Sequence, residues 1–320
     1  LDDFESSEDY YRRALAILEE TVGEDDARYA RVLDHLGLTL QTVGRLEEAE
    51  RLALEALAIR EAVHGELHPS TATSLLNVAT LYLNVGRDEE AEPLLERALV
   101  IDRQTNGEDH PDVAWDLRTL AALYGRQGRH DEAETAALEA LDIWRRYVGD
   151  NHVQVVITYD TLATIYLAAG RHDEAETNAR AALAVARANL GDDHSYTAYG
   201  HFTLAQTLFE RQRYDEAREH YAAAWRIREA TEGPDTNGAM DAQVGLARTY
   251  TALERHDEAL VLYDEWVAQQ SRRFGEGPEL VAALERQAVA LEAAGASDKA
   301  ATVRARAQEI GVDRAASADP

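Results

Sequence analysis

The sequence has no cysteine among its 320 residues. Disulfide bonds, thiolate metal ligands and cysteine nucleophiles are therefore excluded, although this alone does not settle the compartment. No apolar run approaches the roughly 18 residues that a membrane-spanning helix needs. The first residues are acidic, do not begin with methionine and lack the basic region of a secretory signal peptide. We therefore expect a cytoplasmic location and a fragment of a longer chain.

Positive charge is also scarce. The chain has a single lysine, Lys299, and its formal net charge at pH 7 is −28, from 32 basic and 60 acidic side chains. Nucleic acids and anionic membranes bind to positive surfaces, so neither is expected as a partner. Arginine in place of lysine is typical of a high-GC genome. The acidic excess has two interpretations that the sequence leaves open, a solvated acidic surface or adaptation to a salt-rich host.

What the sequence does contain is a repeat of 42 residues. Glycine recurs at this interval seven times, at Gly23, Gly65, Gly107, Gly149, Gly191, Gly233 and Gly275. A second motif, Gly-Arg-x-x-Glu-Ala, keeps the same period at 44–49, 86–91, 128–133 and 170–175. The copies at 212–217 and 254–259 have lost the glycine. A fixed period indicates one supersecondary unit copied along the chain.

Two stretches of helical character lie between these marks. In 71–85 the apolar residues fall on one helical face, as they do in 91–101. Strand alternation is absent, so a propeller blade is not favoured. A glycine that follows a helix can adopt the left-handed conformation without a Cβ penalty. Both the recurring glycine and the glycine of the Gly-Arg motif can therefore end a helix. Each repeat is therefore predicted to be a pair of helices.

We predict an all-α solenoid with one unpaired N-terminal helix at about 7–22, within a half repeat 1–22. Seven antiparallel helix pairs follow, at 24–64, 66–106, 108–148, 150–190, 192–232, 234–274 and 276–310. The small and polar residues 311–320 are expected to form a flexible tail. Gln212 and Glu254 replace a turn glycine, so these turns must change shape or accept strain. Loop-forming residues replace the His-Pro junction at 233–239, where we expect local irregularity and mobility.

The repeat resembles the tetratricopeptide repeat. The spacing of Val78-Ala79, Tyr82, Ala91, Leu95 and Ala98 is similar to that family's pattern. The junctions at 65–69 and 107–114 resemble the 42-residue variant typified by kinesin light chain, and similar arrays occur in bacteria. The resemblance covers nearly the whole chain. It implies a right-handed superhelix whose first helices line the concave side, and it does not name a partner.

Aligning the first helices of the repeats predicts the residues of the concave face. They are Arg31, Asn77, Trp115, Arg118, Ile157, Tyr199, Phe202, Phe209, Arg248 and Arg286. Exposed aromatic rings are good anchors for a protein partner, and the arginines would favour acidic groups. We therefore predict a ligand with apolar and acidic residues. The alternative is that the rings pack between helices and the arginines pair with nearby carboxylates.

One departure from the family affects how a peptide could bind. Arrays that clamp peptides commonly carry asparagine at a set position of the first helix. That position here reads His35, Asn77, Thr119, Thr161, Thr203, Gly245 and Gln287. Threonine cannot make the two-sided contact of an amide. A peptide mode like that of kinesin light chain is therefore not expected.

Catalytic and metal sites are not predicted. The sequence has no HExxH motif, phosphate-binding loop or nucleophile elbow. Histidines recur with the period, but copies one repeat apart stand about 10 Å apart, whereas a metal bond is near 2 Å. We therefore predict no enzyme activity and no cofactor or metal.

Two functions remain open. The leading hypothesis is a non-catalytic protein-interaction scaffold that forms part of a larger regulatory protein. The alternative is a structural or self-association module with an empty groove. In that case the exposed N-terminal helix, with Ala14, Leu15, Ile17 and Leu18, could pair with another copy.

Overall fold

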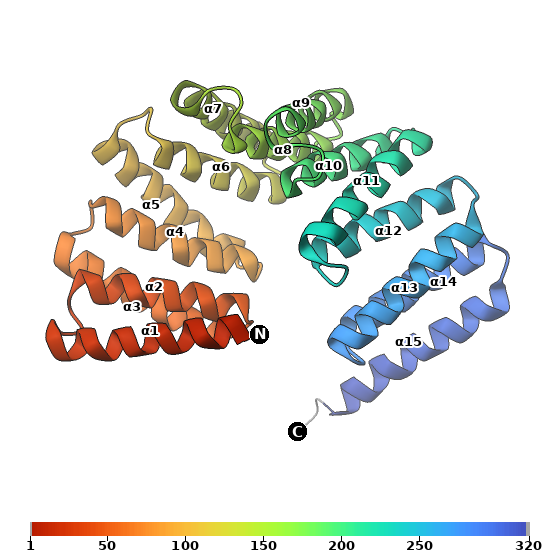
Figure 1. Ribbon diagram of the computed structural model, residues 1–320, viewed down its shortest axis with the longest axis horizontal. Coiled ribbons are helices and arrows are strands. Elements are labelled where there is room, and N and C mark those ends of the chain that lie inside the picture. The colour runs from red at the N-terminus through yellow and green to blue at the C-terminus, as the bar shows by residue number, and fades with distance from the viewer. Residues whose placement is uncertain (1, 318–320) are drawn as a thin grey trace. The chain divides into compact units, whose positions relative to one another are not determined.

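The computed structural model describes residues 2–317, and side-chain surroundings for residues 6–311. Within residues 2–317 it contains fifteen α-helices and no strand (Figure 1). The chain divides into two compact units, Leu1–Gly149 and Asp150–Pro320. A continuous superhelix over the whole chain remains a prediction, and each unit is described by itself.

The first unit consists of one helix followed by three helix pairs. Each helix packs against the next one along the chain, and the pairs are antiparallel in Figure 1. The helices are α1 (Asp2–Thr21), α2 (Ala27–Thr42), α3 (Leu46–His64), α4 (Pro69–Asn84), α5 (Asp88–Asn106), α6 (Pro111–Arg126) and α7 (His130–Val148).

The second unit consists of four helix pairs built in the same way. Its helices are α8 (Val153–Ala168), α9 (His172–Leu190), α10 (Ser195–Glu210), α11 (Tyr214–Glu232), α12 (Asn237–Ala252), α13 (His256–Phe274), α14 (Pro278–Ala293) and α15 (Ser297–Ser317). The prediction of an N-terminal helix and seven helix pairs is therefore confirmed. The helix α1 begins at Asp2, earlier than the expected residue 7.

The periodic histidines cap the first helices. The Nδ1 atoms of His68, His110, His152 and His194 each accept the backbone N–H of the residue two positions later, at 3.1 to 3.2 Å. Such a contact satisfies one of the N–H groups that a helix start leaves without a partner. The recurrence of histidine therefore has a structural cause.

The expected irregularity at 233–239 is wrong. Gly233 has the same backbone conformation as Gly191, with φ and ψ of 96° and 160° against 91° and 170°. Thr236 takes the place of the capping histidine, and its hydroxyl accepts the N–H of Ala239 and donates to the carbonyl of Gly233. Threonine thus supplies the same cap as histidine. The junction that departs from the pattern comes one repeat later, where Gly275 has φ 62° and ψ −142° and Gly277 provides no side-chain cap.

The turns at Gln212 and Glu254 keep their shape and accept strain. Both residues have positive φ, 59° and 58° respectively, in the region that glycine occupies in the other repeats. The closing hydrogen bond is also unchanged, because the N–H of Arg213 donates to the carbonyl of Leu208 at 2.9 Å. The repeat therefore imposes its turn on residues that disfavour it.

Replacing Gln212 by glycine should stabilise the second unit. The left-handed conformation costs a side chain about 1 kcal/mol, which glycine does not pay. We expect the free energy of unfolding to rise by up to about 1 kcal/mol, measured by urea denaturation. Gln127→Gly is the control, because Gln127 lies at a helix end with φ −77°. An equal gain from both substitutions would contradict the explanation.

The C-terminal helix is longer than predicted. We expected a flexible tail from residue 311, but α15 continues through Gly311 to Ser317. No proline interrupts 312–317, and a single glycine inside a helix costs only about 1 kcal/mol. Residues 318–320 of the predicted tail lie outside the described residues.

The arginine of the Gly-Arg motif ties neighbouring repeats together. Arg87 contacts Glu90 of its own repeat at 2.7 Å and Glu50 of the preceding second helix at 2.8 Å. Its guanidinium also lies 4.0 Å from the ring centroid of Tyr82. Arg129 and Arg213 repeat the two carboxylate contacts. The motif thus joins a turn to the repeat before it.

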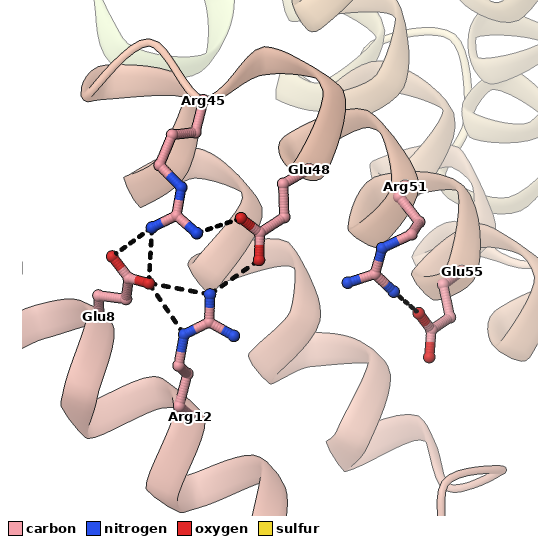
Figure 2. A network of polar contacts seen from close by, with 6 residues as sticks. All are labelled: Glu8, Arg12, Arg45, Glu48, Arg51 and Glu55. Carbon is pink, nitrogen blue, oxygen red and sulfur yellow. Dashed lines mark hydrogen bonds and ion pairs between the residues drawn. The ribbon is translucent and has the colours of Figure 1, made fainter.

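Helix α1 makes the same contact in the first unit (Figure 2). Glu8 accepts from Arg45 at 2.8 Å, and Arg12 donates to both Glu8 and Glu48. Glu8 precedes Glu50 by one period of 42 residues, so it is the equivalent of a glutamate on a second helix. The unpaired helix α1 is therefore a second-type helix in sequence register and in contacts.

Candidate binding surface

All ten predicted site residues lie on first helices, in two groups that belong to different units. In the first unit, Trp115 is 39% exposed and the guanidinium carbon of Arg118 lies 4.8 Å from its ring centroid. Arg31 is exposed and has no ion pair with any residue that the structure describes. Asn77 is half-buried and lies close enough to Asp34 to lower the pKa of its carboxyl. Its amide therefore lies beside a carboxylate within the fold.

A buried ion pair lies beside Asn77. Arg60 reaches from α3 to contact Asp34 of α2 at 2.5 Å, and each residue is 6% exposed. Arg60 also donates to the hydroxyl of Ser74 at 2.6 Å. Burial raises the pKa of Asp34, while the Arg60 guanidinium opposes that rise. The pair joins both helices of one repeat to the first helix of the next.

The aromatic residues of the second unit differ in exposure. Tyr199 is 46% exposed. Phe202 is half-buried and contacts Tyr221 edge to face, with ring centroids 5.8 Å apart. Phe209 is also half-buried and contacts Tyr214 at 5.2 Å. Phe202 and Phe209 thus pack largely within the fold, whereas Tyr199 offers a ring to solvent. Ile157, on α8, is half-buried as well.

The two predicted arginines of the second unit lie over rings and form no ion pair. Arg248 lies 4.8 Å from the ring centroid of Phe209, and Arg286 lies 5.4 Å from that of Trp266. Both are exposed, and neither forms an ion pair with a side chain that the structure describes, residues 6–311. The lack of an ion pair is notable in a chain with 60 acidic side chains. These two guanidinium groups are available to an external acid.

Arg228 is a residue that alignment of the first helices missed, because it lies on a second helix. It is 3% exposed, and its guanidinium carbon lies 4.6 Å from the Tyr199 ring centroid and 4.7 Å from that of Phe202. Its Nη1 donates to the carbonyl of Gly238 at 2.7 Å. Arg228 occupies the same position in its second helix as Arg60 does four repeats earlier. This correspondence is the sequence signal that could have identified Arg228. Where Arg60 meets an aspartate, Arg228 meets Phe202.

Two carboxyl groups complete this part of the second unit. Thr203 donates to Asp160 at 2.5 Å. Burial raises the pKa of Asp160 to about 6, and it also raises the pKa of Asp241; the positive charge of Arg228 opposes both rises. The surface around Tyr199 therefore carries charges of both signs beside an exposed ring. This arrangement can bind a segment through contacts with its apolar and polar groups.

The position that carries asparagine in peptide-clamping arrays is engaged within the fold. Thr203 bonds to Asp160, and Gln287 donates to Asp264 at 2.5 Å. At Gly245 the ring of Tyr221 fills the space, because a Cβ atom there would lie 2.3 Å from a ring carbon. The structural partners explain why these positions differ from the family pattern.

A buried carboxyl pair lies elsewhere in the first unit, between α5 and α6. Asp102 and Asp116 are 6% and 2% exposed, and they share a hydrogen bond. Burial, with the charge of Asp112, raises the pKa of Asp102 to about 6. Burial, with the charge of Asp102 and the hydrogen bond to it, raises the pKa of Asp116 to about 8. Asn106 donates to Asp102 at 3.1 Å. The pair is therefore most stable while it holds a proton.

Replacing Asp116 by asparagine should stabilise the first unit at alkaline pH. The pKa values of the pair are higher in the folded protein than in the unfolded chain, where aspartate titrates near 3.9. The pair therefore contributes fully to stability below that pH, and its contribution is lost as the pH rises through 6 to 8. At pH 8.5 we expect the variant to exceed the wild type by about 2 kcal/mol in urea denaturation, with a smaller difference at pH 5. Asp131→Asn, at an exposed position of α7, is the control. A difference independent of pH would contradict a shared proton.

Comparison with known proteins establishes the family. The tetratricopeptide repeat profile matches residues 1–62, 35–99, 70–146, 117–188, 157–230 and 196–269. The chain therefore belongs to the tetratricopeptide repeat family. Among curated proteins, none matches the sequence.

Three solved structures that share this fold come from different kinds of protein. A putative kinesin light chain with tetratricopeptide-like repeats from Podosopora anserina is 23% identical, with a TM-score of 0.59 over 64% of this chain and 97% of that one. A signal-transduction ATPase with a tetratricopeptide repeat sensor from Pyrococcus horikoshii has a TM-score of 0.67 at 18% identity, over 95% of this chain and 45% of its own. A Rap protein complexed with competence and sporulation factor has a TM-score of 0.62 at 16% identity, over 97% and 86%. These likenesses show the fold alone.

No helix in residues 2–317 is long and apolar enough to cross a membrane. Among the side chains of residues 6–311, no group of three or more histidine, aspartate or glutamate residues converges in a way that could hold a metal ion.

Proposed function

We propose that this chain is a non-catalytic scaffold that binds a peptide or protein segment on the first-helix faces of its repeats. The observation that carries the proposal is that Arg31, Arg248 and Arg286 form no ion pair with any side chain of residues 6–311, in a strongly acidic protein. Exposed arginines without an internal partner, beside the partly exposed rings of Trp115 and Tyr199, favour a ligand with acidic and apolar residues.

The wider setting is part of the same proposal. A tetratricopeptide array serves as the sensor of the Pyrococcus ATPase, and a Rap protein was solved in complex with a factor. By analogy we propose that this chain is the sensing or docking part of a longer, cytoplasmic regulatory protein.

A peptide array with matched acidic and amide versions of apolar sequences tests the ligand class. Wild-type protein should bind the Asp- and Glu-containing peptides, and Arg248→Glu/Arg286→Glu should lose at least about tenfold in affinity, which corresponds to about 1.4 kcal/mol. The control Lys299→Glu/Arg306→Glu makes the same charge change at two exposed positions of α15, away from the first-helix faces. If only the first double variant loses affinity, the site lies in the second unit. Trp115→Ala with Arg118→Glu tests the first unit in the same assay. Unchanged affinity in all variants would refute the proposed surface.

A second candidate function, self-association, is favoured by one feature of α1. Tyr10 and Ile17 are 69% and 61% exposed. At the position of Ile17 in the next three repeats, Ile59 is half-buried and Ile101 and Ile143 are at most 1% exposed. Two such faces could pair through apolar contact. Light scattering across a concentration series tests this. A dimer that Ile17→Asp abolishes would support self-association, and a monomer at all concentrations would exclude it.

A further inference from the structure

Two histidines replace an apolar contact between α10 and α11 in the second unit. The Nδ1 atoms of His201 and His220 lie 2.7 Å apart, and the ring centroids are 5.0 Å apart. Three repeats earlier, the same two positions hold Leu75 and Leu94, which pack in one apolar cluster. A contact that another repeat makes with two leucines is thus made here through a hydrogen bond.

The number of protons that this contact can hold is limited by its geometry. One of the two facing Nδ1 atoms must donate and the other must accept, so the neutral pair shares one proton. A first added proton can enter at the Nε2 atom of the donor ring and leave the contact intact. A second added proton places N–H groups on both facing atoms. The hydrogen bond is then lost, and two adjacent imidazolium ions repel each other.

The surroundings contain charges of both signs. The positive charges are Arg180 and Arg187 of α9 and Arg226 of α11, and the negative ones are Asp192 before α10 and Glu216 and Glu219 of α11. Burial is the largest influence and lowers the pKa of both histidines, that of His201 to about 4. The pair is therefore neutral near pH 7. Because the unfolded histidines bind protons near pH 6.5, stability is lost as the pH falls from about 6.5 toward 4.

We propose that the His201–His220 contact is an acid-sensitive switch that holds α10 against α11 at neutral pH and releases it on acidification. The release would affect the surface described above. Tyr199 and Phe202 flank His201 on α10, and Tyr221 adjoins His220 on α11. The ring contact between Phe202 and Tyr221 joins the same two helices. Opening this pair of helices therefore dismantles the aromatic part of the second unit. The switch itself does not depend on whether that surface binds a ligand.

The test compares the full chain with His201→Leu/His220→Leu, which copies the contact of Leu75 and Leu94. Thermal unfolding is followed by circular dichroism at pH 7.5 and at pH 5.2, above the sequence pI of about 4.7. Between pH 7.5 and pH 5.2, the unfolding midpoint of the wild type should fall by at least about 3 °C more than that of the leucine variant. The control variant His130→Leu/His172→Leu also removes two half-buried histidines. Its unfolding midpoint should fall by as much as that of the wild type. Equal falls in the wild type and the leucine variant at 201 and 220 would overturn the proposal.

Two measurements on the wild type keep the proposal testable if the leucine variant does not fold. Amide hydrogen exchange, corrected for intrinsic rates, should accelerate in α10 and α11 at pH 5.2 more than in α14 and α15. Histidine side-chain resonances should show His201 and His220 titrating together, below the ordinary range of histidine. Uniform acceleration along the second unit, or independent titration of the two rings near pH 6.5, would refute the switch.

Discussion

Replacing Asp34 by alanine is expected to lower the free energy of unfolding of the first unit by about 3–5 kcal/mol. The substitution leaves the Arg60 guanidinium buried without the carboxylate that lies 2.5 Å away in the wild type. Its remaining acceptors, the hydroxyl of Ser74 and the carbonyl of Ser70, are neutral. Neutral acceptors cannot replace the charge of a carboxylate in a site from which water is excluded. Urea denaturation of the full chain measures the effect.

A double variant shows whether the cost comes from the unpaired charge. In Asp34→Leu/Arg60→Met both charges are absent, and such a replacement of a buried pair is often close to neutral. We expect it to recover most of the stability that Asp34→Ala loses. The control Asp9→Ala removes the carboxylate that lies 3.6 Å from Arg13 at an exposed position, where a pair contributes at most about 1 kcal/mol. If the double variant were as unstable as Asp34→Ala, lost packing rather than the unpaired charge would explain the effect.

Replacing Gly245 by alanine is expected to destabilise the second unit by about 3 kcal/mol, at the upper end of the cost of overpacking. The new Cβ atom would lie 2.3 Å from a carbon of the Tyr221 ring. That ring is 3% exposed and is held by Phe202, so it has little room to move. Gly37→Ala is the matched control, because a Cβ there meets its nearest atom at 3.5 Å.

A second substitution tests whether the ring is the cause. Leucine occupies the position of Tyr221 three repeats earlier, at Leu95, which is fully buried. In Gly245→Ala/Tyr221→Leu the clash is absent, so the cost of the alanine should fall below about 1 kcal/mol relative to Tyr221→Leu alone. A full double-mutant cycle in urea gives this coupling energy. Additive effects would mean that the alanine acts through something other than the ring.

The repeated features of the fold could be predicted from the sequence because their causes are local. A turn that needs positive φ selects glycine at a fixed interval, and a helix that packs on both neighbours selects apolar residues on one face. The prediction is wrong at 233–239 because loop-forming residues do not by themselves make a junction irregular. Thr236 instead caps α12 as a histidine caps other first helices, so different residues build the same junction. At Gln212 and Glu254 the repeat also determined the backbone, against the preference of the residues.

The candidate surface could be predicted only in part. Its first-helix residues follow from the register, whereas Arg228 comes from a second helix and meets Tyr199 and Phe202 through packing. Whether an arginine is isolated or paired also depends on side chains from other repeats. Arg60 and Arg228 share one register, yet only Arg60 faces an aspartate.

The sequence by itself determined the repeat length, the helix pairs and the residues that first helices present, since each depends on spacing along the chain. The tertiary structure decided which of those residues are already engaged. Asn77 lies beside Asp34, Phe202 packs against Tyr221, and Arg248 and Arg286 lie over rings and form no ion pair with the side chains of residues 6–311. The physical reason is that burial and pairing depend on contacts between side chains from different helices, which differ at each interface even though the backbone repeats.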